Sequence, residues 1–421
     1  MPSPEARPPW SLGQRIAFRF AFVYFVVYSF PYPLTELPKG DKIALPWDWV
    51  LHHVVPAFGK HVLHVTSPIT FEPNGSGDKT YDYLLVALSL LFSAAVTLVW
   101  SIVDRRRLRY DRAWTLFVIY TRYVLAVTMA SYGFSKLLDL QFQPPKPFRL
   151  AQAYGDSSPM GLMWTFMGAS VPYTMFAGAA ELVGGALLLF RRTALLGALV
   201  LLGVMGNVVM LNLCYDVCVK LYSAHLWLMA LILTLPDLRR LYDFFIRQRA
   251  VAAASVATPF ARGRLRWVRL VMKPLFILNI FYSLGYKQFE DGKKYRDQGP
   301  QGAMSGMWDV PSATSDGQPA TPGWRRVNVT NQLLFYRRWD DKRIGYTLVD
   351  DGSKKTLTLT PFERPKDPPS VLTYVRAGDK GTLDGVLEGK VVHVELRYID
   401  TAKSLLMTRG FHWINEEPFN R

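Results

Sequence analysis

Two ionisable residues lie deep inside apolar stretches of the chain, where an isolated charge is costly enough to need a partner. Glu181 is nine residues from the end of the stretch 172–190, and Arg122 is nine residues from the start of the stretch 113–138. At 1.5 Å per residue, both would be roughly 14 Å deep in two membrane-spanning helices. We therefore predict an ion pair. It would either fix helix packing, or serve as part of a proton relay or of the wall of a ligand cavity.

A lysine ends the motif Gly133-Phe-Ser-Lys136, near the opposite end of the stretch 113–138. Because Lys136 is several residues shallower than Glu181, a direct contact between the two would need helix tilt or a long side-chain reach. Lys136 is therefore either an interfacial lysine that extends toward the polar surface, or a functional amine that donates to an oxygen of a bound ligand.

A second polar group lies around residue 215. Asn212, Asp216 and Lys220 are spaced by four, so a helix would place them on one face, and His225 follows in the next apolar stretch. Asp216 and His225 are candidates for a proton relay in a pocket at this end, and a charged turn between helices is the alternative. Asn207 and Asn212 lie within an apolar stretch and favour hydrogen bonds between helices.

The chain has two cysteines, Cys214 and Cys218, four residues apart. They are near the predicted outer end of a span, where an oxidising compartment would permit a dithiol to act. In a regular helix their Cα atoms would be about 6 Å apart, near the upper limit for a disulfide. A redox pair and two small buried apolar residues are the two interpretations.

Histidines cluster between the first two predicted spans. His53, His61 and His64 would occupy one arc of a helix and are candidate metal ligands. Pro56 and Gly59 interrupt such a helix, so the alternative is an amphipathic segment at the membrane surface.

The elements that must position these residues are apolar stretches long enough to cross ~30 Å of hydrocarbon as helices. Residues 83–103 and 193–215 contain no formal charge. Five weaker stretches complete a predicted set of seven, at residues 15–32, 113–138, 172–190, 221–236 and 267–286. The first part of the chain is therefore predicted to be an α-helical membrane bundle. Residues 159–168 predict a short helix that would cover its cavity.

Basic residues orient the predicted bundle. The net charge is +16, from 49 basic and 33 acidic residues. The basic segments 104–112, 191–192 and 239–269 fall on one side of the seven spans, which is predicted to be cytoplasmic, together with the N-terminus. The first span is expected to be a retained anchor. Membrane lipids are the expected partners, and no aromatic-basic module suits nucleic acid.

From about residue 287, Gly, Pro and Asp separate short alternating runs, which predicts a small all-β extracytoplasmic domain, either a barrel or a sandwich. The predicted strands are 324–330, 343–349, 356–360, 371–375, 391–398 and 404–413. Gly306-Met-Trp308 resembles the Gly-x-Trp signature of lipocalin-like barrels, with Arg409 on the last strand expected to cover the tryptophan. An unrelated meander is the alternative.

Residues 113–240 resemble the DoxX-like membrane proteins. The resemblance rests on Gly133-Phe-Ser-Lys136 and Glu181-Leu-Val-Gly184-Gly185, which match a G-x-x-K and an E-x-x-G-G in that family's four-helix core. It implies a bacterial inner-membrane location and, for some members, association with quinone-linked or thiol-linked oxidoreductases. Three segments lie outside the resemblance: N-terminal helices (1–112), a linker with the last helix (241–286) and the β-domain (287–421).

Three functions are open from the sequence. The first is an accessory or subunit of an envelope oxidoreductase with quinone as cofactor. In it, Lys136 would donate to the quinone oxygen and Asp216 and His225 would relay protons, while Arg122 and Glu181 hold the bundle. The second is a lipid or hydrophobic-ligand handling or transport protein, whose β-domain receives the ligand. The third is a membrane scaffold without catalysis.

Overall fold

The computed structural model describes residues 9–252, 267–296, 302–321, 323–410 and 412–413. The chain divides into two compact units. The helical unit comprises Met1–Gln141 and Pro172–Gly292, and the barrel unit comprises Phe142–Val171 and Lys293–Arg421. Part of the predicted basic linker, residues 253–266, lies outside the described residues.

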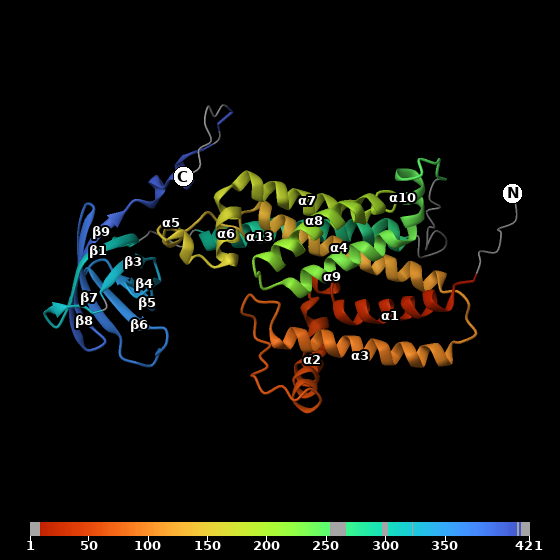
Figure 1. Ribbon diagram of the computed structural model, residues 1–421, viewed down its shortest axis with the longest axis horizontal. Coiled ribbons are helices and arrows are strands. Elements are labelled where there is room, and N and C mark those ends of the chain that lie inside the picture. Colours follow the sequence, from red (N-terminus) through yellow and green to blue (C-terminus); the bar gives the residue numbers. More distant parts are fainter. Residues whose placement is uncertain (1–8, 253–266, 297–301, 322, 411, 414–421) are drawn as a thin grey trace. The chain divides into compact units, whose positions relative to one another are not determined.

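Six helices of the helical unit are long and apolar enough to cross a membrane, judged by length and composition. They are α1 (Leu12–Ser29), α3 (Thr80–Val103), α4 (Asp111–Leu137), α7 (Val171–Leu189), α8 (Ala194–Cys214) and α9 (Lys220–Thr234). The candidate spans at α1 and α9 include the helical turns that follow, and end at Glu36 and Phe245. Each corresponds to one of the predicted stretches, because a long uninterrupted apolar sequence satisfies its backbone groups best as a helix. Close pairs include α8 with α9 and α1 with α3, which lie side by side in Figure 1.

The seventh predicted stretch, residues 267–286, is helical but irregular. It consists of α-helical and π-helical segments in immediate succession: η4 (Val268–Met272), α12 (Lys273–Ile280), η5 (Phe281–Lys287) and α13 (Gln288–Arg296). Pro274 has no backbone N–H, and local π-helical turns are one way in which an apolar helix satisfies the backbone group that a proline leaves unpaired. This run is not among the six candidate spans found in the described part of the chain.

Between α1 and α3 the chain forms the 3-10 turn η1 (Leu34–Glu36) and a further helix, α2 (Asp41–His61). The expected interruption of this helix is wrong, because α2 continues through both Pro56 and Gly59. Its buried residue Val55 packs against Tyr81 and Leu84 of α3. After α9 the chain continues through η3 (Leu235–Asp237) into α10 (Leu238–Phe245).

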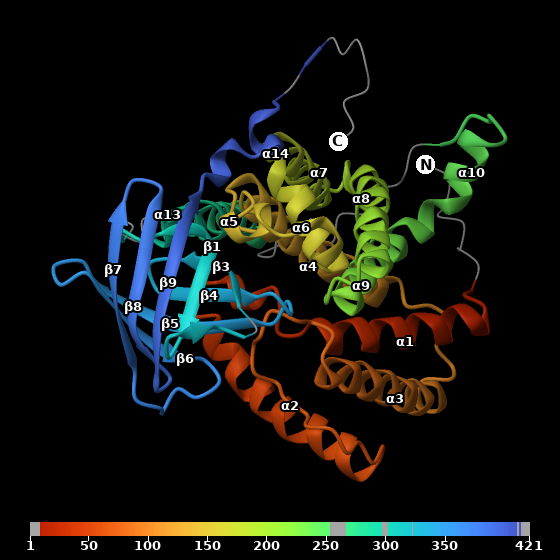
Figure 2. The same cartoon turned by 60° about the vertical axis from the view of Figure 1, so that its left-hand side comes forward.

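The barrel unit is built on one antiparallel sheet. Its strands are β1 (Gly306–Ser315), β2 (Gln318–Pro319), β3 (Trp324–Val329), β4 (Leu333–Arg338), β5 (Arg343–Asp351), β6 (Thr356–Pro361), β7 (Ser370–Ala377), β8 (Lys380–Leu387) and β9 (Lys390–Ile399). All except the short β2 pair in sequence order, and β1 also pairs with β9, which closes an eight-stranded barrel (Figure 2). Closure leaves no unpaired edge among these eight strands.

Inward side chains fill the barrel. They alternate with outward ones along each strand, as in Leu357 and Leu359 of β6 or Leu372 and Tyr374 of β7. The core includes the completely buried Trp308, whose Nε1 donates to the carbonyl of Met304.

Five of the six predicted strands are confirmed, as β3, β5, β6, β7 and β9. The sixth, 404–413, is wrong: the chain there forms the 3-10 turn η6 (Thr401–Lys403) and the helical turn α14 (Leu405–Thr408), and residue 411 lies outside the described residues. The Asp400 side chain starts this turn by accepting from the backbone N–H of Ala402. The expected cover of Trp308 by Arg409 is also wrong, since the guanidinium of Arg376 on β7 lies 5.1 Å from the Trp308 ring.

The barrel unit also contains three short helical segments from the middle of the chain. They are α5 (Pro147–Leu150), η2 (Tyr154–Asp156) and α6 (Pro159–Ala169). The predicted short helix at 159–168 is α6, and it groups with the barrel strands rather than with the helices that flank it in sequence. Within the unit, Asp156 forms an ion pair with Arg337 of β4 at 3.0 Å.

Candidate functional site

Glycines bring the backbones of α4 and α7 together. A Cβ atom at Gly185 would lie 2.9 Å from Cβ of Met129 and 3.0 Å from the carbonyl oxygen of Ala126. One at Gly178 would lie 2.7 Å from Cβ of Lys136. Without side chains at these two points the helices can touch. The G-x-x-K and E-x-x-G-G motifs therefore form the two sides of one helix contact.

That contact places Lys136 on Glu181. Nζ of Lys136 lies 2.9 Å from Oε1 and 2.7 Å from Oε2 of the carboxylate, and both residues are buried. The predicted pair between Arg122 and Glu181 is therefore wrong. Equal distance from the ends of two stretches does not fix their register. Because Gly178 packs at Lys136, the part of α4 opposite Glu181 lies close to Lys136 and far along the helix from Arg122.

Arg122 binds the C-terminal end of α7 and not Glu181. Its Nε and Nη2 donate to the carbonyl oxygen of Leu188, at 2.9 and 2.5 Å. Lys273 donates to the next carbonyl, that of Leu189, at 2.7 Å. Both carbonyls belong to the last turn of α7, where they have no partner within the helix and where cations are favourable. Arg122 and Lys273 thus cap α7.

Two tyrosines, Tyr132 and Tyr222, lie next to the Lys136–Glu181 ion pair and extend the polar site toward α9. The Tyr132 ring centroid lies 5.4 Å from Nζ of Lys136 and 6.4 Å from the ring centroid of Tyr222 on α9. The Tyr222 hydroxyl is 3.4 Å from that of Thr128. One turn further along α9, His225 lies on the same face as Tyr222.

His225 is enclosed by α1. Its Nδ1 lies 2.6 Å from the carbonyl oxygen of Leu221 and must donate, since a carbonyl only accepts. In the neutral ring, Nε2 then accepts from the Tyr24 hydroxyl at 2.5 Å. Tyr28 stacks on the imidazole with 4.0 Å between ring centroids. Tyr24, Tyr28, Tyr132, Tyr222 and His225 are called the tyrosine–histidine cluster below.

Sequence reasoning missed the contribution of α1. The signal was present, because Phe20, Tyr24 and Tyr28 are spaced by four and therefore share one helix face. It also missed the buried Arg19, which donates to the hydroxyl of Tyr110.

Asp216 and Lys220 form the charged turn that was the alternative interpretation. They pair with each other at 2.8 Å, but the Asp216 side chain is 81% exposed. No contact links Asp216 with Lys136 or His225 among the described residues, so the expected relay through Asp216 is not supported. The carboxylate of Asp78 accepts from the backbone N–H groups of Lys220 and Leu221, at 2.8 and 3.0 Å, and caps the start of α9.

The two asparagines of α8 differ. Asn212 is buried, and its Nδ2 donates to Oγ of Ser223 on α9 at 2.9 Å, which confirms the expected bond between helices. Asn207 lies on the exposed face of α8, where the expected bond is not found in the described residues.

The cysteines are not bridged. Cys214 is exposed and Cys218 half-buried, and both thiols are free. The interpretation as two buried apolar residues is therefore wrong for Cys214. Cys214 is exposed at the end of α8, which does not support a redox dithiol that acts together with the buried Lys136–Glu181 ion pair.

The histidine set does not form a metal site. His53 binds the carbonyl of Trp49 through Nδ1, at 2.7 Å, and His64 lies beyond the end of α2 in a left-handed conformation with φ of 51°. In the part of the chain that the structure describes, no group of three or more His, Cys, Asp or Glu side chains could hold a metal ion. The predicted metal site of His53, His61 and His64 is therefore wrong. Helix α2 ends at His61, so His64 does not lie on the same helix face as the other two histidines.

The fold and the buried site together define a class: a helical protein with six candidate membrane spans, an internal ion pair and a separate antiparallel barrel. The chain is 35% identical over 135 residues to the uncharacterized protein YwoB of Bacillus subtilis (strain 168). The alignment covers 32% of this chain and 85% of that relative, so the chain belongs to the family of YwoB. No family model matches the chain, and no solved structure matches it.

Proposed function

We propose that the helical unit is a membrane subunit or accessory of a quinone-linked oxidoreductase in the bacterial inner membrane. The observation behind this proposal is the buried Lys136–Glu181 ion pair next to the tyrosine–histidine cluster. Ionisable groups inside apolar helices are expensive, and in membrane proteins they often mark proton relays and ligand sites. The DoxX-like motifs Gly133-Phe-Ser-Lys136 and Glu181-Leu-Val-Gly184-Gly185 supply both members of this ion pair, which favours the same proposal.

The chemistry required is the binding of a quinone head group and the movement of protons. A quinone that accepts two electrons from a partner protein also takes up two protons. The Tyr132 and Tyr222 hydroxyls would donate to its oxygens, and the Lys136–Glu181 pair would exchange protons with them. Besides the Lys136–Glu181 pair, His225 can also change its protonation. It is held in place by hydrogen bonds to Tyr24 and to a backbone carbonyl.

A groove on the helical unit favours a ligand with an apolar chain. It has a volume of about 510 Å³ and is lined mainly by Phe190, Leu270, Pro274, Ile277, Leu278 and Phe281. Phe281 packs against Phe134 of α4, with 5.6 Å between ring centroids. An isoprenoid chain in this groove would bring its head group toward α4.

The orientation belongs to the same proposal. The Arg-rich loop between α3 and α4 would be cytoplasmic by the positive-inside rule. If the helical run 267–296 crosses the membrane, the barrel unit is extracytoplasmic. The alternative of a barrel that carries an apolar ligand inside gains no support, because Trp308, Leu334, Leu357 and other buried side chains fill its interior.

The test is mass spectrometry of small molecules extracted from the detergent-purified, full-length protein. It compares the wild type with the double variant Lys136→Met/Glu181→Leu, which removes both charges together, and with Asp216→Asn as the control at the exposed ion pair. We expect near-stoichiometric quinone in the wild type and the control, and its loss in a folded double variant. Equal amounts of quinone in all three, or lipid alone in the wild type, would rule out the proposed role.

A further inference from the structure

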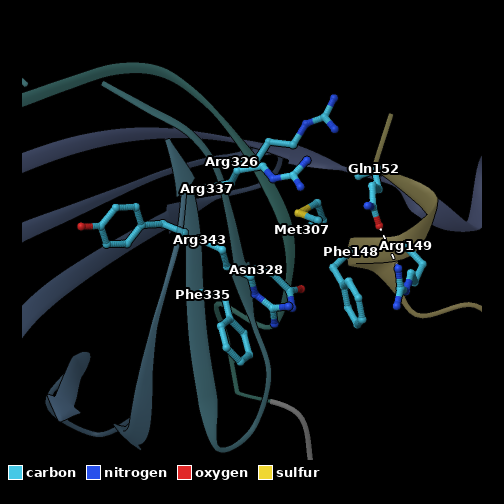
Figure 3. A pocket seen from close by; sticks show the side chains of 11 residues that line it. Phe148, Arg149, Gln152, Met307, Arg326, Asn328, Phe335, Arg337 and Arg343 are labelled. Carbon is cyan, nitrogen blue, oxygen red and sulfur yellow. Dashed lines mark hydrogen bonds between the residues drawn. The ribbon is translucent and has the colours of Figure 1, made fainter. Parts of the chain in front are cut away.

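The barrel unit has a cavity on its outer face, between strands β3–β5 and helix α5. Its volume is about 160 Å³. Strand alternation explains the lining: Asn328 lies between the inward Val327 and Val329, so its side chain points outward. Figure 3 shows the strand side chains on one side of the cavity, and Phe148, Arg149 and Gln152 of α5 and the following residues on the other.

Four of the lining residues are arginines, and none is acidic. They are Arg149, Arg326, Arg337 and Arg343. Arg337 is neutralised by Asp156 at 3.0 Å, but Arg326 approaches Asp309 only at 4.0 Å, and its buried Nε has no hydrogen-bond partner among the described residues. A cavity with several incompletely compensated guanidinium groups attracts anions.

Arg149 and Arg343 have only neutral contacts in the part of the chain that the structure describes. Arg149 donates to Oε1 of Gln152 at 3.1 Å. The Arg343 guanidinium lies between two rings, 3.8 Å from the centroid of Phe335 and 5.4 Å from that of Phe148. Burial, followed by the positive charges of Arg149 and Arg337, lowers the pKa of Arg343. An anion between these side chains would remove that repulsion.

We propose that this cavity binds a phosphate group, carried either by a phospholipid head group or by a soluble phosphate ester. A phosphate carries up to two negative charges and several acceptor oxygens, which matches a set of arginines that presents more than one uncompensated positive charge. The rings of Phe335 and Phe148 hold the Arg343 guanidinium in place, so little side-chain entropy is lost when it binds the anion. Asn328 and Gln152 supply further donors at the cavity wall.

The test uses the full-length protein in a maltoside detergent at constant ionic strength, titrated by calorimetry. The two probes are inorganic phosphate and dihexanoyl phosphatidic acid. The variants Arg343→Met and Arg149→Met each remove one guanidinium, whereas Arg364→Met removes an exposed arginine of the same barrel that pairs with Glu388 at 2.6 Å. We expect saturable binding that falls at least ~10-fold in the first two variants and less than ~2-fold in the third.

The outcomes separate the two sources of phosphate. Tighter binding of phosphatidic acid assigns the site to a lipid head group, and equal or tighter binding of inorganic phosphate assigns it to a soluble ester. No saturable binding of either probe, or an equal loss in Arg364→Met, would overturn the proposal. If Arg343→Met fails to fold, Arg149→Met decides, because Arg149 lies on the short helix α5 and not on a strand of the barrel.

Discussion

Lys136 on α4 and Glu181 on α7 form a buried two-point contact, with Nζ of the lysine 2.9 and 2.7 Å from the two carboxylate oxygens. The contact exists because Gly133 and Gly178 let the two helix backbones meet beside it. Charge pairing and close helix packing thus occur at the same point of the helical unit, and a separate substitution tests each of them.

Removing one charge of the pair should be more harmful than removing both. Glu181→Leu alone leaves Lys136 buried without its carboxylate, and we expect a loss of about 3–5 kcal/mol in the free energy of unfolding. The double variant Lys136→Met/Glu181→Leu should recover most of that loss. Unfolding in mixed micelles measures both. Equal losses in the single and double variants would show that the pair does not act as a unit.

The close approach of α4 and α7 predicts a difference between two glycines. In Gly185→Ala the new Cβ would meet Met129 and the backbone of Ala126, so we expect destabilisation of about 1–3 kcal/mol. In Gly203→Ala, on α8, a Cβ meets nothing within 4 Å, so the higher helix propensity of alanine should leave stability unchanged or raise it by up to ~1 kcal/mol. Thermal unfolding of the purified variants gives the comparison, and a tolerated Gly185→Ala would contradict the packing.

The barrel should depend on Arg376 and not on Arg409. Arg376 lies over Trp308 and also donates to the carbonyl of Gly378 at 3.3 Å, so Arg376→Met should lower stability by about 1–2 kcal/mol. Arg409→Met is the comparison, and we expect a smaller loss of stability there, because Arg376 lies over the Trp308 ring. Calorimetric thermal unfolding of the purified variants measures both changes. A larger loss of stability in Arg409→Met than in Arg376→Met would contradict this prediction and favour the lipocalin-like arrangement, in which Arg409 covers Trp308.

Acid should weaken the loop between β5 and β6. Hydrogen bonds from the Ser353 hydroxyl and the Lys354 backbone N–H lower the pKa of Asp351. Because the folded pKa is below the ordinary value near 4, the stabilisation is complete above that value and is lost as pH falls through the lowered pKa. Asp351→Asn should therefore reduce the pH dependence of barrel unfolding below about pH 4.

Ser353→Ala provides the check on this cause. It removes the hydroxyl that donates to Asp351 at 2.6 Å and should reduce the same pH dependence in part. An unchanged acid profile in both variants would show that other carboxylates govern the response of the barrel.

The sequence alone determined most of the helices and about half of the strands of this protein. Long apolar stretches specify helices whatever their neighbours, because their backbone groups are satisfied locally, and six of the seven predicted stretches are candidate spans. Alternation likewise located β5, β6 and β9. Strands β1, β4 and β8 were missed because Pro311, the dibasic end of β4 and two glycines of β8 obscure that alternation.

Only the tertiary structure decided which residues meet. Glu181 pairs with Lys136 rather than Arg122 because the glycine contacts set the register of α4 against α7, and Arg376 rather than Arg409 covers Trp308 because of the order in which strands close the barrel. The cluster around His225 needs Tyr24 and Tyr28, about 200 residues away in sequence. Such partners depend on helix register and strand closure, and these follow from packing across the whole unit rather than from local periodicity.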